Sequence, residues 1–174
     1  MNVVTADGVL GILRTSGRET YVGEPVTVAE HSLQAARAAE LDGAAPSLVV
    51  AALLHDVGWL LQAGPRRHEE RGAAFLVELF GPEVTEPIRL HVVAQRYLCT
   101  IDPDYRAALS GTSRRTLARQ GGRLDEPARE AFAAEPFSAD AVRLRLYDDR
   151  AKLPGADVPD LDYYAPLVTA SLCH

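Results

Sequence analysis

The segment 48–61 is apolar on nearly every side, yet His55 and Asp56 stand together in its middle. A helix that is apolar all round is buried, so the helix expected to open near Pro46 would hold two ionisable groups away from water. Burying such groups is costly unless they are paired or bind a metal ion. Taken alone, the pair leaves two interpretations open: a histidine that hydrogen-bonds to the backbone, or a metal site.

Other histidines lie on expected helices in positions that favour the second interpretation. His31 shares a helix face with Ala35 and Ala38, whose small side chains leave space for an ion. Asp148 follows Leu144 by four residues, on the face that must point inward. Each residue alone is more often part of a core or a surface than a ligand. Together the candidates form a set of four imidazoles and two carboxylates: His31, His55, Asp56, His68, His91 and Asp148.

This ligand set has a definite chemical preference. Imidazole and carboxylate without thiolate suit iron, manganese or zinc, and the two cysteines, Cys99 and Cys173, are too few for a thiolate zinc site or a disulfide framework. Six ligands exceed what one catalytic ion uses while keeping an open position. We therefore expect two ions, with Asp56 as the bridge because one carboxylate can offer an oxygen to each.

The periodicity of the chain is helical throughout. Strand signals are weak, and Ala and Leu dominate. Thr27 and Glu30 fit a capping box that starts the first expected helix, and Gly43 ends it. The expected helices cover 27–43, 46–61, 67–80, 84–98, 110–119, 125–132, 138–152 and 161–172. We predict one all-α domain over residues 1–174, a helical bundle with a dinuclear metal site in its core.

Composition narrows the possible partners. The 18 Lys and Arg against 24 Asp and Glu give a formal charge of −6, which argues against binding nucleic acid or an anionic membrane. The longest apolar run is far short of the roughly 20 residues that a membrane span needs, and Met1 begins no signal-peptide pattern. We expect a cytoplasmic protein that acts on a small molecule as a monomer or weak homodimer.

Several stretches carry a resemblance to a known family. They are YVGEPVTVAEHSLQAA at 21–36, ALLHDVGWL at 52–60, RHEERGAAFL at 67–76, FGPEVTEPIRLHVVAQRYL at 80–98, DPDY at 102–105 and RLYDDRAK at 145–152. Their order resembles the HD-domain superfamily, and within it the mixed-valent diiron oxygenases of the PhnZ type, which act on 2-amino-1-hydroxyethylphosphonate. The resemblance covers residues 21–152.

The resemblance implies how the ligands are shared. One iron would be held by His31, His55, Asp56 and Asp148, and the other by Asp56, His68 and His91. The family uses an Fe(II)/Fe(III) pair and O2 as cosubstrate. It breaks a C–H bond beside a hydroxyl group, and in the phosphonate branch the C–P bond then cleaves to give an amino acid and inorganic phosphate.

The resemblance also implies substrate contacts. Tyr21 and Glu24 lie in a Gly-Pro turn that would form a lid, in which the tyrosine occupies an iron position before substrate arrives and the glutamate meets a substrate amine. Ser113 and Arg145 match the anion contacts of the family. We therefore expect a small hydroxylated, amine-bearing substrate such as a 1-hydroxy-2-aminophosphonate.

Two positions depart from the family pattern. Gln95 stands four residues after His91, where the family has a phosphonate-binding lysine, and Trp59 stands four residues after His55, where many members have a histidine. Both lie one helical turn from a ligand and are expected to contact substrate. The nearest cations that would compensate are Arg96, Arg114 and Arg115.

Two alternatives to an oxygenase remain open from sequence. The same ligands would hold Mn or Zn in a phosphohydrolase that activates water to cleave a phosphate ester or nucleotide. The chain would otherwise be a non-catalytic HD domain that binds metal without turnover.

Overall fold

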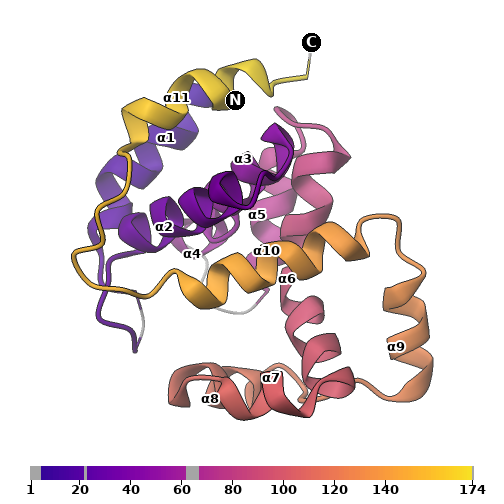
Figure 1. Cartoon of the computed structure of the whole chain (residues 1–174). Helices are drawn as coiled ribbons and strands as arrows, with labels where there is room; N and C mark the ends of the chain where they lie inside the picture. Colours follow the sequence, from indigo (N-terminus) through magenta and orange to yellow (C-terminus); the bar gives the residue numbers. More distant parts are fainter. Residues whose placement is uncertain (1–4, 22, 62–66, 174) are drawn as a thin grey trace.

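The computed structural model describes residues 5–21, 23–61 and 67–173, and these residues are helical, as predicted (Figure 1). Within them the β-pairing is limited to an isolated bridge between Thr20 and Thr27. The elements are α1 (Ala6–Thr15), the short 3-10 helix η1 (Ser16–Arg18), α2 (Val28–Leu41), α3 (Pro46–Leu54), α4 (Val57–Leu60), α5 (His68–Leu76), α6 (Pro82–Ile101), α7 (Pro103–Ala108), α8 (Gly111–Arg119), α9 (Glu126–Ala133), α10 (Ser138–Arg150) and α11 (Leu161–Ala170). No helix in these ranges is both long and apolar enough to cross a bilayer.

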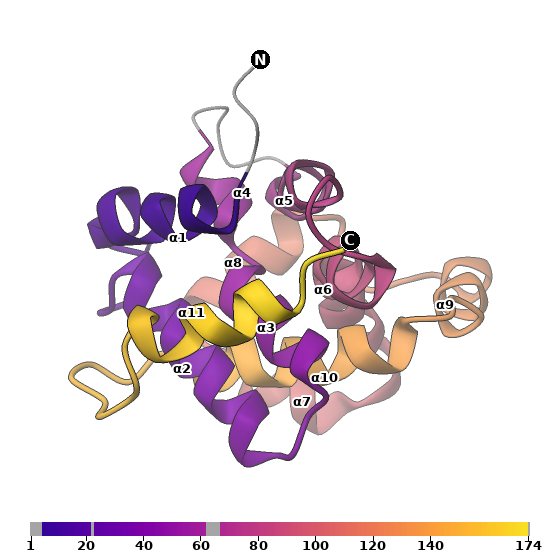
Figure 2. The same ribbon diagram turned by 90° about the horizontal axis from the view of Figure 1, so that it is seen from above.

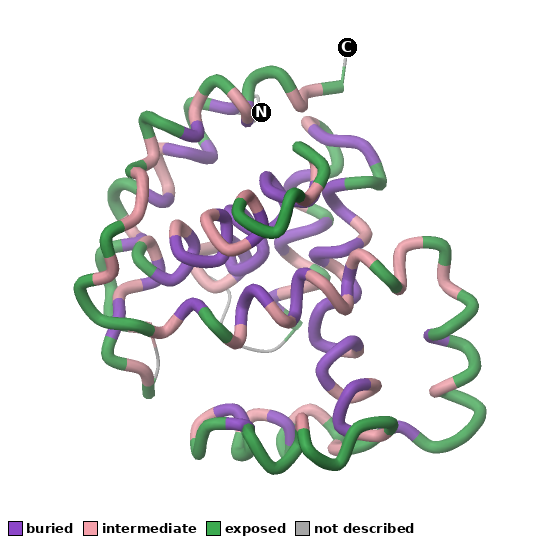
Figure 3. The backbone as a smooth tube through the Cα atoms, viewed as in Figure 1, coloured by how far each residue is buried: buried purple, intermediate pink, exposed green. Residues whose placement is uncertain are grey.

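Four helices, α2, α3, α6 and α10, make up the centre of the bundle. They pack against one another, α6 on α10, α2 on α3 and α2 on α10, and α5 packs on α6. Figures 1 and 2 show α1 and α11 together on one side, and α7, α8 and α9 beyond the other. Burial follows this plan: the central helices carry the buried residues, and α9 is mostly exposed (Figure 3).

Helix α3 is the core of the bundle, because every residue from Leu48 to Leu54 is buried. Each fully buried Leu or Val contributes roughly 1.5–3 kcal/mol relative to exposure. The sequence expectation of one helix over 46–61 was wrong, however. The helix stops at Leu54, and Asp56 has φ −102° and ψ 10° before α4 begins at Val57.

The break has a structural consequence for the His-Asp pair. Successive residues of a continuous α-helix point about 100° apart, so neighbours on an unbroken helix face different directions. The non-helical backbone at Asp56 removes that constraint, and both His55 and Asp56 are almost completely buried at the same place. Periodicity did not reveal the break because the residues on both sides of it are apolar.

Other boundaries differ less. The helix expected over 67–80 ends at Leu76 and continues as turns to Phe80. Helices α1 and α7 were not predicted. In α1 a Thr5 cap and buried Val9, Leu10 and Leu13 mark an amphipathic helix, whereas α7 has six residues, of which none is buried.

The predicted capping box at the start of α2 is present. The Thr27 side chain accepts from the Glu30 amide at 3.1 Å, and the Thr27 amide donates to the Glu30 carboxylate at 2.7 Å. Thr27→Ala is expected to lower the free energy of unfolding by about 1 kcal/mol, measured by urea denaturation. Thr169→Ala is the matched control, because the Thr169 hydroxyl bonds only a carbonyl of its own helix. An equal loss in both variants would contradict the capping role.

Candidate metal centre

Four imidazoles surround the carboxylate of Asp56, two on each side. The Asp56 Oδ2 atom lies 3.6 Å from His31 Nε2 and 3.4 Å from His55 Nε2. The Oδ1 atom lies 3.2 Å from His68 Nε2 and 3.8 Å from His91 Nε2. The structure thus brings these side chains from α2, the α3–α4 break, α5 and α6 to one point, with one carboxylate oxygen facing each pair of rings.

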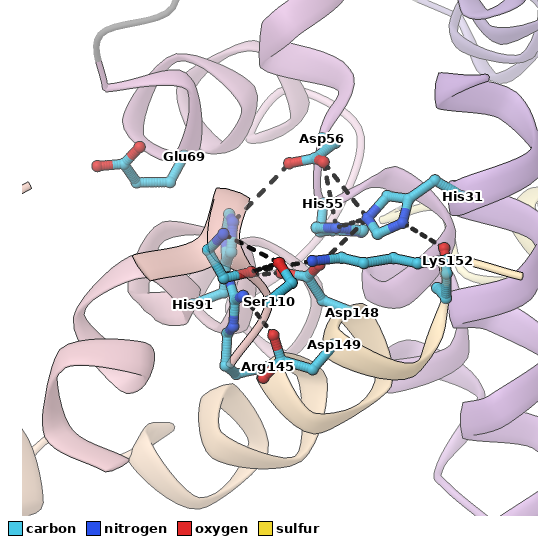
Figure 4. A network of polar contacts seen from close by, with 12 residues as sticks. His31, His55, Asp56, Glu69, His91, Ser110, Arg145, Asp148, Asp149 and Lys152 are labelled. Atoms are coloured by element: carbon cyan, nitrogen blue, oxygen red, sulfur yellow. Dashed lines mark hydrogen bonds and ion pairs between the residues drawn. The ribbon is translucent and has the colours of Figure 1, made fainter. Parts of the chain in front are cut away.

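Asp148 of α10 adds a second carboxylate to one side. Its Oδ1 atom lies 3.2 Å from His31 Nε2, and Figure 4 shows it across from Asp56 beside the His31 and His55 rings. The centre is therefore unequal: two imidazoles and two carboxylates on the His31 side, and two imidazoles with the shared Asp56 on the His68 side. All six residues proposed as ligands are buried.

Hydrogen bonds to the backbone fix which ring nitrogen carries the proton. His31 Nδ1 lies 2.7 Å from the Ala151 carbonyl, His55 Nδ1 lies 2.8 Å from Ala52, and His91 Nδ1 lies 2.7 Å from Ile88. A carbonyl can only accept, so Nδ1 donates in each ring and Nε2 keeps its lone pair. His68 Nδ1 instead faces the Glu69 carboxylate at 3.3 Å. Such outer contacts are typical of histidines that bind metal.

The centre lacks the partners that buried polar atoms need. Both oxygens of Asp56 and Oδ1 of Asp148 are buried without a hydrogen-bond partner among the described residues. The Nε2 atoms meet in pairs, His31 with His55 and His68 with His91, each at 3.2 Å. Two Nε2 lone pairs that face each other repel, and a buried carboxylate oxygen without a hydrogen-bond partner lowers the stability of the fold. A cation on each side of Asp56 would satisfy every one of these atoms, so the residues fit two metal ions.

The electrostatics favour the metal-binding forms of Asp56, His55 and His91. Burial acts to raise the pKa of Asp56, but His55, His68 and His31 outweigh it and hold that pKa well below its ordinary value. Burial lowers the pKa of His55, and burial with the nearby His68 and His55 rings lowers the pKa of His91 to about 3. At His31 burial acts to lower the pKa, but the Asp148 and Asp56 carboxylates outweigh it and raise that pKa. Neutral imidazole and ionised carboxylate are the forms that bind metal.

A cavity of about 1320 Å³ opens onto the centre. Its walls include every residue predicted from sequence to contact substrate, namely Tyr21, Glu24, Trp59, Gln95, Arg96, Ser113 and Arg145. Arg115 also lines it, whereas Arg114 does not belong to the lining and reaches the Ala107 carbonyl at 3.4 Å. Three of the six proposed ligands, His68, His91 and Asp148, also belong to the lining.

Two aromatic rings cover the imidazoles on the cavity side. Tyr21 stacks on His31 with ring centroids 4.4 Å apart, and Trp59 stacks on His68 at 4.7 Å. Burial and the Asp56 and Asp148 carboxylates raise the pKa of Tyr21 well above its ordinary value, so its phenol stays neutral. The rings leave the Nε2 edges free for metal while they exclude water from one face of each imidazole.

Two arginines that line the cavity, Arg145 and Arg96, are bound to acceptors of the protein itself. Arg145 pairs with Asp148 at 2.7 Å and with Asp149, and Tyr105 donates to the same Asp149. Arg96 donates through Nε to the Gly122 carbonyl at 2.8 Å. Arg145 thus shares its charge with a candidate ligand, and Arg96 anchors the turn after α8.

Lys152, Glu69 and Ser110 are among the polar residues of this cavity region that sequence reasoning missed. Lys152 and Glu69 line the cavity, and Ser110 caps α8 beside it. A signal existed for the first two: Lys152 follows Asp148 by four residues, and Glu69 is adjacent to His68. Ser110 carried no signal of its own, because a serine before a helix is expected as a cap wherever it occurs.

The fold and the centre define a helical metal-binding protein with a His-Asp pair at its core, and the family comparison agrees. The model of the HD domain family matches residues 28–150, and the chain belongs to the HD-domain family. It is 42% identical over 166 residues to a hydroxymethylphosphonate dioxygenase from Gimesia maris, across 90% of this chain and 83% of that protein.

Two further relatives match over a similar length. A [1-hydroxy-2-(trimethylamino)ethyl]phosphonate dioxygenase (glycine-betaine-forming) from Leisingera caerulea is 38% identical over 167 residues, across 91% of this chain and 85% of that protein. Uncharacterized protein L432 of Acanthamoeba polyphaga mimivirus is 33% identical over 171 residues, across 92% of this chain and 78% of the viral protein. The similarity in each case spans the whole candidate centre.

Proposed function

We propose that this protein is an iron-dependent dioxygenase that cleaves the C–P bond of a small hydroxyphosphonate. The observation that carries the proposal is the Asp56 carboxylate, with one oxygen facing His31 and His55 and the other facing His68 and His91. The names of the two bacterial relatives support the reaction class.

Iron is the metal we propose, in an Fe(II)/Fe(III) pair. Imidazole and carboxylate donors without thiolate suit it, and His31, His55, Asp56 and Asp148 would hold one ion while Asp56, His68 and His91 hold the other. Bound there, the pair would supply the activation of O2 and the oxidation of a C–H bond.

The overall reaction balances without a further reductant. A substrate R–CH(OH)–PO3²⁻ and one O2 give R–COO⁻, HPO4²⁻ and one proton. The C–H and C–P bonds break, the carbon gains one oxygen, and the phosphorus gains the other. The four electrons that reduce O2 all come from the substrate, so the reaction requires no external electron donor.

The cavity residues would bind and orient the substrate. We assign the phosphonate to Arg145, Ser113 and Lys152, whose cationic and hydroxyl groups share one wall. Tyr21 and Trp59 would exclude water from the imidazoles, and Gln95, which is buried with its Nε2 unpartnered, would donate to a substrate oxygen. Arg96 of α6 is the other cavity cation that we assign to substrate, and it also donates to the Gly122 carbonyl after α8.

The test combines metal analysis with product measurement. Protein loaded anaerobically with Fe(II) is expected to hold two ions per chain and, after oxidation by one electron per chain with a chemical oxidant, to give the paramagnetic signal of a mixed-valent pair. With a hydroxyphosphonate and O2 it should consume O2 and release phosphate in equal amounts. Omission of O2 is the control and should abolish phosphate release. Turnover of a phosphate ester without O2 uptake would identify a hydrolase, and metal binding without turnover in either assay would identify a non-catalytic domain.

We further propose that the protein acts in the cytoplasm. It would do so as a single HD domain, in the form of a monomer or weak homodimer. Cys99 and Cys173 are both free, which fits a reducing compartment.

A further inference from the structure

Glu24 and Lys152 form an ion pair at the edge of the cavity. The Lys152 Nζ atom lies 3.3 Å from Glu24 Oε1, and the two side chains are only 16% and 9% exposed. Such a pair is screened by solvent less than one on an open surface. The carboxylate that sequence reasoning assigned to a substrate amine therefore already has a cationic partner from the protein itself.

Two serines complete the surroundings of this pair. Lys152 Nζ donates to Ser113 Oγ at 3.0 Å. Ser110 Oγ donates to Glu24 Oε1 at 3.2 Å and lies 3.1 Å from Ser113 Oγ. Figure 4 shows the Lys152 side chain extended from the end of α10 to Ser110, beside Asp148. An ammonium group has three donors, and these contacts use two of them. The third can meet an oxygen of an anionic ligand.

The neighbouring Arg145 does not compete with Lys152 for Glu24. Arg145 is taken up by Asp148 and Asp149, so Lys152 is the cation paired with Glu24. A ligand ammonium placed against Glu24 Oε1 would also lie near the Lys152 ammonium, which is 3.3 Å from that oxygen. Its attraction to the carboxylate would be offset by repulsion from the lysine, whereas a neutral group would meet no such penalty.

We propose that Lys152 is a specificity-determining residue that makes this site select hydroxyphosphonates without an ammonium group. This inference rests on the proposed function for its substrate class. Lys152 neutralises Glu24 and offers its remaining donor to the phosphonate. The chain then favours a substrate with a neutral end, of which hydroxymethylphosphonate is the smallest.

The test uses two ligands of equal size that differ in one charge. (1-Hydroxypropyl)phosphonate ends in a methyl group where (2-amino-1-hydroxyethyl)phosphonate ends in an ammonium group. Binding is followed without turnover by the fluorescence of Trp59, the only tryptophan, which lines the cavity. Titrations are anaerobic, on iron-loaded protein. The kcat/KM of each ligand for O2-dependent phosphate release is measured separately.

The native protein is expected to bind the methyl-ended ligand more tightly. Lys152→Gln should move the ratio of the two affinities about tenfold or more toward the ammonium-ended ligand, because Glu24 loses its internal partner. In the double variant Glu24→Gln/Lys152→Gln that shift should disappear, since no carboxylate remains to attract the ammonium. Lys152→Gln can also weaken binding of the phosphonate group itself. That loss affects both ligands equally, so it does not change the ratio of their affinities.

Arg89→Gln is the matched control. Arg89 is also a paired cation, 2.6 Å from Glu86, but it lies outside the cavity lining, so the ratio should stay unchanged. A native preference for the ammonium-ended ligand, or a Lys152→Gln ratio equal to the native one, would overturn the inference. Selective binding without O2-dependent phosphate release would instead overturn the proposed function and leave the selectivity in place.

Discussion

Replacing Gly58 with alanine is expected to destabilise the protein by about 3 kcal/mol or more. A Cβ atom at this position would lie 1.9 Å from the His68 carbonyl oxygen, 2.8 Å from the His68 carbonyl carbon and 2.9 Å from the Gly72 amide nitrogen. All three are backbone atoms, so no side-chain rotation relieves the clash. Helix α5 must move away from α4, and His68 moves with it.

The readouts are urea denaturation and metal content. Because His68 faces Asp56 at 3.2 Å, its displacement should also lower the metal content from the proposed two ions per chain to one. Gly11→Ala is the matched control: the same substitution inside α1 meets no atom within 4 Å and is expected to stabilise the protein by roughly 0.5–1 kcal/mol. A Gly58→Ala variant as stable as the native protein would contradict the close approach of α4 and α5.

Replacing Asp56 with alanine is expected to abolish binding of both metal ions. Each of its oxygens faces a different pair of imidazoles, so its removal takes one anionic ligand from each side at once. Imidazoles bind metal in their neutral form, so the remaining ligands of the His68 side would supply no compensating negative charge. Metal content by elemental analysis should fall from two ions per chain to a trace, and O2 consumption should stop.

Asp162→Ala is the control for this loss. It also removes a carboxylate, but one that is exposed, pairs with Arg14 and does not belong to the cavity lining. Its metal content should equal that of the native protein. Retention of one tightly held ion by Asp56→Ala would show that Asp56 belongs to a single site and is not a bridge.

The sequence was a good guide wherever the signal was local. The capping box of Thr27 and Glu30 located the start of α2, and Gly81 with Pro82 separated α5 from α6. It was a poor guide at Asp56, since a short break inside a fully apolar stretch leaves no change of period to detect. The short α7 gave no buried face to reveal it.

The candidate centre was accessible to sequence reasoning because its residues are chemically conspicuous. Histidines and aspartates are out of place on apolar helix faces, and six of them stand out in an Ala- and Leu-rich chain. The pairing of Glu24 with Lys152 was not accessible, because it depends on how the turn before α2 and the end of α10 come together. The sequence around a charged residue does not identify its ion-pair partner when that partner lies far away in the chain.

The backbone carbonyls that accept from the imidazoles come from different parts of the chain on the two sides of the centre. His55 and His91 are each steadied by a carbonyl three residues earlier on their own segment, so those rings are oriented as soon as the local chain is helical. His31 depends on Ala151, beyond the end of α10, and Gln34 clamps the adjoining Leu153 backbone at 2.9 and 3.0 Å. The His31 side is therefore complete only where the chain after α10 packs against α2, whereas the His91 ring is oriented within α6 itself.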